Sequence, residues 1–158
     1  MALASLTTYW IMTGPVALLF GKPTTEIGAL WAVISTVFVY RDTRAHSAAA
    51  GISRLIATFV SFLLCSAYLI LFPSTGVGMA ALIAIGAALM IVVGRPDDAT
   101  TTAVTIAVIM VVAAMSPREA LQQPILRLFD TFVGVVLGVL WKSLASLLYA
   151  LLAREAPR

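Results

Sequence analysis

The chain has 158 residues, of which 61% are hydrophobic and 11% charged, and its formal net charge is +3. Soluble domains carry about 25% charged residues, so a soluble globule of this size could not cover so much apolar surface. The 40 residues from Leu55 to Gly94 contain no charge, and a membrane-spanning helix needs about 20 apolar residues. The composition therefore excludes a soluble domain. It predicts an integral membrane protein of one domain, residues 1–158, surrounded by membrane lipid.

Six apolar segments follow one another along the chain, separated by proline, glycine and charged residues. We expect them at about 4–20, 27–40, 52–72, 77–94, 99–116 and from Pro124 to about 153. All should be α-helices, because lipid offers no hydrogen-bond partner to an open backbone. The second segment is short for a full span. The sixth is long, and we expect Lys142 to divide it and leave an amphipathic C-terminal tail, about 146–158, along the interface.

The first segment has no basic region before it and no clear cleavage site, so we interpret it as a mature span and not as a signal peptide. Gly14-Pro15 within it predicts a kink, because proline removes a backbone donor. Such a kink serves either a broken transporter helix or ordinary packing, and the sequence does not separate the two. Cys65 is the single cysteine and is expected to be a small apolar filler.

Basic residues predict the orientation of the chain. If both termini are cytoplasmic, the inside segments hold Arg41, Arg44, Arg54, Arg95, Arg154 and Arg158, and the outside segments hold Lys22, Arg118 and Arg127. The positive-inside rule favours this arrangement. We therefore expect a multi-pass protein of the bacterial inner membrane with both termini in the cytoplasm.

A short sequence recurs at an offset of 73 residues. Residues 53–64 and 126–137 match at six of twelve positions, including Arg54 with Arg127 and Thr58 with Thr131. The match predicts two repeats, at about 4–72 and 77–145. Because each repeat has three spans, an odd number, the second must be inverted in the membrane. The expected fold is an all-α membrane protein with six transmembrane helices arranged as two inverted three-helix repeats.

The recurring residues suit an anion pathway. An arginine in a hydrocarbon-length segment is costly and is usually paired, hydrated or functional. Arginine and threonine four positions apart lie on one helical face, and the guanidinium fork fits a carboxylate. The candidate substrate-binding residues are therefore Arg54, Thr58, Arg127 and Thr131.

Small residues continue the same helical face. Gly134 and Gly138 form a Gly-x-x-x-Gly pattern, which lets a second helix approach closely. In the first copy Ser61 and Cys65 stand at the matching positions, and both are small. We therefore expect Gly134 and Gly138 to be helix-packing residues.

Three further groups have both a structural and a functional interpretation. Arg41, Arg44 and His46 form a basic loop, which serves topology and lipid contact or concentrates anions at a cytoplasmic mouth. Asp130 either neutralises Arg127 three residues before it or couples transport to protons. Asp97-Asp98 is expected to be a turn and N-cap for the fifth segment and not a metal site, because no further acid or histidine lies nearby.

The sequence contains no catalytic set. It has one histidine and one cysteine, and it lacks zinc-ligand spacing, a Gly-x-Ser-x-Gly motif and a phosphate loop. A membrane enzyme of the phospholipid-synthesis kind would be expected to cluster several aspartates on facing helices. We therefore expect neither an enzyme nor a cofactor or metal, and no nucleic-acid partner.

Two stretches carry a resemblance to a known family. The run ALWAVISTV at 29–37 is followed by a basic loop and by GISRLIAT at 51–58, and this order resembles the fusaric acid resistance family. That family is also called the aromatic acid exporter family and is similar to plant aluminium-activated malate transporters. Its members open a span with an Arg-x-x-Gly-Thr-x-x-Gly motif. Here Ala57 and Ser61 replace the glycines of the first copy, and in the second copy Asp130 replaces one glycine while Gly134 keeps the other.

The resemblance implies six-helix blocks, two of them around a pathway, supplied by a fused chain or a dimer. It also implies transport of organic anions, often aromatic carboxylates, with Arg54, Thr58, Arg127 and Thr131 at the motif positions. We therefore expect an organic-anion exporter that works as a homodimer, with a periplasmic adaptor as a further candidate partner. The alternative is a non-transporting membrane scaffold or a subunit of a larger efflux assembly.

Overall fold

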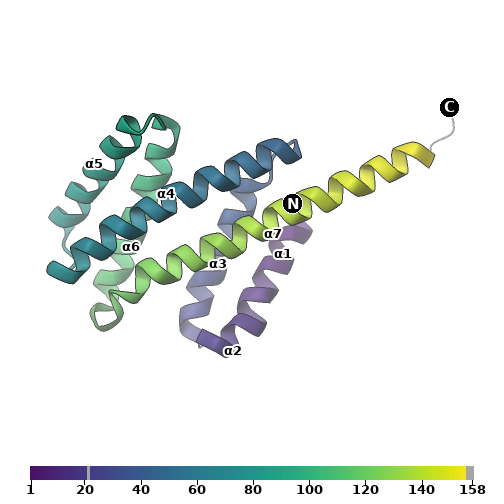
Figure 1. The fold of residues 1–158 in the computed structure, drawn as a ribbon. Coiled ribbons are helices and arrows are strands. Elements are labelled where there is room, and N and C mark those ends of the chain that lie inside the picture. Colours follow the sequence, from purple (N-terminus) through teal and green to yellow (C-terminus); the bar gives the residue numbers. More distant parts are fainter. Residues whose placement is uncertain (21, 156–158) are drawn as a thin grey trace. The chain divides into compact units, whose positions relative to one another are not determined.

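The computed structural model (Figure 1) describes residues 1–20 and 22–155, with the side chains of 1–18 and 26–151. The regular secondary structure of these residues is all helical, which confirms the predicted class. The chain divides into two compact units. Unit 1 is Met1–Ile52 with Asp130–Arg158, and unit 2 is Ser53–Phe129. The helices are α1 (Ala2–Ile11), η1 (Met12–Val16), α2 (Ala17–Phe20), α3 (Lys22–Val39), α4 (Arg44–Leu71), α5 (Gly76–Val92), η2 (Pro96–Asp98), α6 (Ala99–Met115), η3 (Pro117–Glu119) and α7 (Gln122–Glu155).

Several of these helices suit a membrane. Within the described residues, three stretches are long and apolar enough to cross a bilayer, namely Arg44–Leu71, Pro96–Met115 and Gln122–Leu151. Glu26–Val39 and Gly76–Val92 are apolar but shorter. Length and composition therefore confirm a multi-pass membrane protein.

Helix α4 begins earlier than the hydrophobic pattern predicts. The hydroxyl of Thr43 accepts a hydrogen bond from the backbone N–H of His46 at 3.1 Å, which caps the first turn. Arg44 and His46 therefore lie in the helix and not in a loop as expected. A local cap, and not the start of the apolar run, sets this boundary.

Helix α7 is unbroken in Figure 1, so the expected division at Lys142 is wrong. Lysine is a good helix former, so a helix can continue through it. The Nζ atom of Lys142 lies 5.4 Å from the ring centroid of Tyr40, also in unit 1. This cation–π contact gives the charge a partner without bending the backbone.

The first segment carries a local irregularity at the predicted position. Residues Met12–Val16 form a π-helical turn that contains Pro15. A proline inside an α-helix removes one backbone donor and clashes with the preceding turn. The wider π turn accommodates this defect while α1 and α2 continue on either side of it.

Unit 1 packs through hydroxyls and glycines. The hydroxyls of Thr8 in α1 and Thr36 in α3 lie 3.0 Å apart, and Thr36 also donates to the Gly134 carbonyl oxygen of α7 at 3.0 Å. A Cβ atom at Gly134 would lie 2.2 Å from the Ala32 carbonyl oxygen. One at Gly138 would lie 3.1 Å from the Thr36 carbonyl oxygen. The two glycines thus lie where the backbone of α7 packs directly against that of α3.

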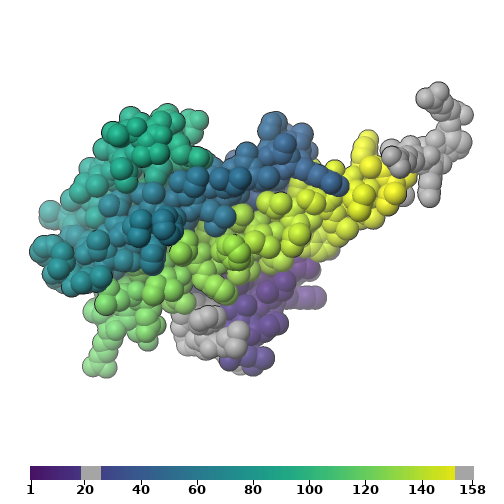
Figure 2. Space-filling model, in the orientation of Figure 1, coloured from purple at the N-terminus to yellow at the C-terminus, as the bar shows by residue number. Residues whose placement is uncertain are grey.

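Unit 2 packs in the same manner around the consecutive helices α5 and α6. The hydroxyl of Ser61 in α4 donates to the Thr102 carbonyl oxygen of α6 at 3.2 Å. Beside this contact lies an apolar core of Cys65, Leu82, Ile106, Ile109 and Met110. Figure 2 shows the side chains of α4 and α5 in contact on the face of unit 2 that it presents.

We predict that Gly134→Ala destabilises the protein. Alanine favours a helix over glycine by about 1 kcal/mol, but its Cβ meets backbone that no side-chain rotation can move. Overpacking of this kind costs about 1–3 kcal/mol or more. Thermal unfolding in detergent, followed by tryptophan fluorescence, measures the difference. Gly14→Ala is the control because a Cβ there meets nothing within 4 Å, and an equal melting temperature for the two variants would contradict the prediction.

Candidate functional site

The four predicted anion-binding residues are distributed over the two units. Arg54 is half-buried and Thr58 is buried, and both lie on the part of α4 that belongs to unit 2. Arg127 lies on α7 at the end of unit 2 and is only 4% exposed. Thr131 is fully buried on α7 in unit 1. The structure therefore gives three of the four to unit 2 and one to unit 1.

Thr131 has an unusual environment for a hydroxyl. Its Oγ1 atom is buried and makes no hydrogen bond within the described part of the chain. Buried hydroxyls are nearly always bonded, since an unsatisfied one costs about 1–3 kcal/mol. Such a group is available to a ligand or a water molecule. One residue earlier, Asp130 packs on α3, where a Cβ at Gly28 would lie 2.7 Å from its Oδ1 atom.

The predicted basic mouth lies at one end of unit 1. Arg41 and Arg44 are exposed, and Arg44 donates from Nη2 to the Ser143 carbonyl oxygen of α7 at 2.7 Å. The backbone N–H of Arg41 bonds to the Ser47 hydroxyl at 2.9 Å. Lys142, next to Ser143 in α7, adds a further cation to the same end. This arrangement can attract anions and also anionic lipid.

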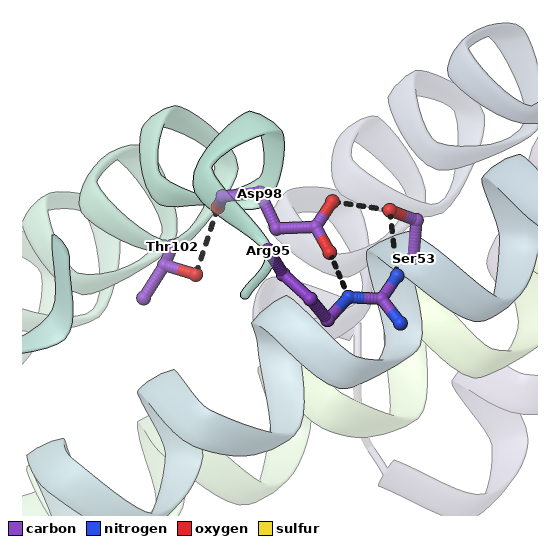
Figure 3. A network of polar contacts seen from close by, with 4 residues as sticks. All are labelled: Ser53, Arg95, Asp98 and Thr102. Atoms are coloured by element: carbon purple, nitrogen blue, oxygen red, sulfur yellow. Dashed lines mark hydrogen bonds and ion pairs between the residues drawn. The ribbon is translucent and has the colours of Figure 1, made fainter. Parts of the chain in front are cut away.

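A polar cluster in unit 2 was not predicted as a site. Figure 3 shows Ser53 of α4 with Arg95 and Asp98 of the turn between α5 and α6, and we call these three residues the Arg95 cluster. Arg95 donates from Nε to Asp98 Oδ2 at 2.6 Å and from Nη2 to the Ser53 hydroxyl at 3.2 Å. Ser53 in turn donates to Asp98 Oδ1. The three side chains therefore form a closed ring of hydrogen bonds.

The turn that presents this cluster is specified locally. Gly94 has φ +78, a left-handed conformation that glycine adopts without strain and that ends α5. Pro96 then begins a short 3-10 turn. Asp98 occupies the N-cap position of α6, as predicted, but its side chain makes no capping bond. Its carboxylate instead joins the Arg95 cluster, and the Thr102 hydroxyl bonds to its backbone carbonyl at 3.0 Å.

A signal for Arg95 exists in the sequence. Gly94-Arg95-Pro96 follows Gly21-Lys22-Pro23 at the same offset of 73 that relates Arg127 to Arg54. Each copy therefore has a cation before a proline, 32 positions ahead of its motif arginine. The side chain of Lys22 lies outside the described residues. An alignment extended upstream of the motif would have marked Arg95 as a second repeated cation.

Unit 2 also has a half-open cavity of about 680 Å³ at the other end of α6. It is lined by residues 69–74, 113–114 and 117–122, with Arg118 and Glu119 as its charged groups. None of the four predicted anion-binding residues lines it. In the described part of the chain, no three histidine, cysteine, aspartate or glutamate side chains come together as metal ligands.

Comparison with protein families gives one result. Residues 14–141 match the family described as fusaric acid resistance protein-like, which covers most of the chain and confirms the resemblance. No well-characterised protein matches in a sequence search, and no solved structure matches either.

We predict that Ser53→Ala lowers the free energy of unfolding by about 1–3 kcal/mol, because the hydroxyl makes two hydrogen bonds, one to Asp98 and one from Arg95. The loss is limited because Arg95 keeps its ion pair with Asp98. Thermal unfolding in detergent measures it. Ser66→Ala on the same helix is the control, because the Ser66 hydroxyl has no hydrogen bond to the described residues. If the two variants unfold alike, the Ser53 hydroxyl does not stabilise the cluster.

Proposed function

The chain belongs to the fusaric acid resistance protein-like family, and we propose that it exports organic anions, aromatic carboxylates in particular. The family match implies transport. The observation that supports an anionic substrate is the presence of two arginines, Arg54 and Arg127, in apolar helices. A guanidinium binds a carboxylate through two parallel charge-assisted hydrogen bonds. The apolar side chains of the helices would accept the aromatic ring of the substrate.

The buried hydroxyl of Thr131 supports the same assignment. It lies one helical turn after Arg127 on α7, so that arginine and hydroxyl share a face. A substrate carboxylate that accepts from a guanidinium has lone pairs left for a hydroxyl. We propose that Thr131, and by repetition Thr58, donates to the anion. A bound anion would thereby satisfy the hydroxyl, which has no partner among the described residues.

We propose further that the six helices are two inverted repeats. Equivalent positions of the two repeats make similar contacts, one in each unit, and this similarity supports the proposal. Ser61 and Gly134 align at the offset of 73, and each faces a backbone carbonyl of the helix packed on it. Ser61 meets Thr102 in unit 2, and Gly134 meets Ala32 in unit 1. In this proposal the third helix of each repeat packs on the first two of the other.

A homodimer is the proposed transporting form, because the family resemblance implies two six-helix blocks around one pathway. A periplasmic adaptor is a further proposed partner. The proposed location of the chain itself is the bacterial inner membrane, with both termini in the cytoplasm. In that topology the Arg95 cluster faces the cytoplasm and the cavity beside Arg118 opens on the outer side. The cytoplasmic cations Arg41 and Arg44 would concentrate anions at the entrance, and Asp130 is the proposed coupling carboxylate.

We predict that Arg54→Ala and Arg127→Ala each reduce flux of labelled benzoate at least about tenfold in vesicles that hold the purified protein. A hydrogen bond to a charged group contributes about 1.5–3 kcal/mol, which corresponds to a factor of ten or more. Succinate, a dicarboxylate without a ring, is measured in parallel to test the preference for aromatic acids.

The control variant is Arg118→Ala, which removes an exposed cation outside the proposed pathway. Size-exclusion chromatography checks that each variant keeps the oligomeric state of the wild type. Flux equal to that of empty vesicles for every acid, in well-folded wild-type protein, would refute transport and favour the scaffold alternative. Normal flux in both arginine variants would refute the assigned residues.

We predict that Thr131→Val separates stability from transport. Valine has nearly the same shape and removes a buried hydroxyl without a partner, so the melting temperature should stay equal or rise. Benzoate flux should fall, because the anion loses a donor. Thermal unfolding and vesicle flux measure the two quantities on one preparation. The control is Thr13→Val, at a partly exposed threonine whose hydroxyl bonds to the Tyr9 carbonyl oxygen one turn earlier. Unchanged flux would exclude Thr131 from the pathway.

A further inference from the structure

We propose that Arg95 is a third carboxylate-binding residue and that Asp98 occupies it until a substrate anion arrives. This inference rests on the proposed function, because it concerns how the same organic anions are bound. The two groups in the 2.6 Å ion pair are a guanidinium and a carboxylate, the chemistry already assigned to Arg54 and substrate. Asp98 is therefore an internal analogue of the ligand.

The two partners differ in accessibility. The side chain of Arg95 is 35% exposed, whereas that of Asp98 is 9% exposed. An anion can therefore reach the guanidinium without first opening a closed core. Arg95 uses Nε and Nη2 in the Arg95 cluster, and its remaining N–H groups can make the first contact with an incoming carboxylate before Asp98 is released.

Asp98 keeps other stabilising contacts when Arg95 turns away. The Ser53 hydroxyl donates to its second oxygen, Oδ1. In addition, Asp98 stands at the N-terminus of α6, a helix of 17 residues, where the helix dipole favours a negative charge. Release of Arg95 therefore does not leave an unsolvated carboxylate, and exchange of one anion for another is energetically accessible.

The cluster lies beside a residue already assigned to the pathway. Ser53, the α4 member of the cluster, directly precedes Arg54 in the sequence. Arg95 is thus held against α4 within one residue of the motif arginine along the helix. The repeat supplies a second, independent observation, since Arg95 and Lys22 recur at the offset of Arg127 and Arg54. Asp98 aligns with the uncharged Thr25, so the internal carboxylate belongs to one copy.

The test compares equilibrium binding of labelled benzoate to the wild type and to Asp98→Asn in lipid nanodiscs. Asparagine keeps the shape and removes the competing charge, so affinity should rise. The apparent Kd should fall by the reciprocal of the fraction of molecules in which Arg95 is free, about tenfold if the pair is closed in nine molecules of ten. Arg95→Gln should instead weaken binding. A purely structural ion pair predicts that both variants lower stability and shift affinity in the same direction.

Asp97→Asn is the matched control, because Asp97 is the exposed neighbour in the same turn and loses the same charge. If Asp98→Asn does not fold, Asp98→Glu moves the carboxylate by one methylene, and a smaller rise in affinity is expected. Wild-type binding with unchanged or weaker binding in the Asp98 variants overturns this inference alone. Absence of benzoate binding in the wild type and in every variant overturns the proposed function as well.

Discussion

Close contact between helices without a hydrophobic driving force is the constraint on which this structure depends. Lipid tails are as apolar as leucine, so helices in a membrane associate through small residues and interhelical hydrogen bonds. Gly134 brings α7 against the Ala32 carbonyl, and the Thr36 hydroxyl bonds across the same contact. Larger side chains at these points would separate the helices. The many apolar side chains that remain exposed are then the surface offered to lipid.

The same constraint explains why the repeated sequence has a small residue at the same position in both copies. Arginine and threonine come first on the shared helical face of each copy. The next residue on that face, Ser61 or Gly134, must be small, because a backbone carbonyl of a neighbouring helix lies beside it. Glycine meets the requirement in one copy and serine in the other, and serine adds a hydrogen bond to Thr102. Packing therefore fixes the small residue, whereas packing alone gives no reason for an arginine about two turns earlier.

The sequence predicted the helical class, the membrane location and the family, because all three follow from hydrophobicity and from a motif within short stretches. It failed where one side chain overrides the hydrophobic pattern. The Thr43 cap starts α4 before its apolar run, and the contact of Lys142 with Tyr40 lets α7 continue past a charge. The Arg95 cluster was missed because Ser53 and Asp98 are 45 positions apart, a distance at which single-sequence periodicity carries no information on contacts.

An internal carboxylate also answers a requirement of any transport site. The site must bind its anion strongly enough to take it up and weakly enough to let it leave. A guanidinium with no competing anion would hold a carboxylate more tightly, since its charge-assisted hydrogen bonds would have no other acceptor on the protein. With Asp98 beside Arg95, the departing substrate is replaced by a carboxylate of the protein, so the cation is never left unpaired. The charge of Arg95 is thereby paired in the occupied state and in the empty state alike.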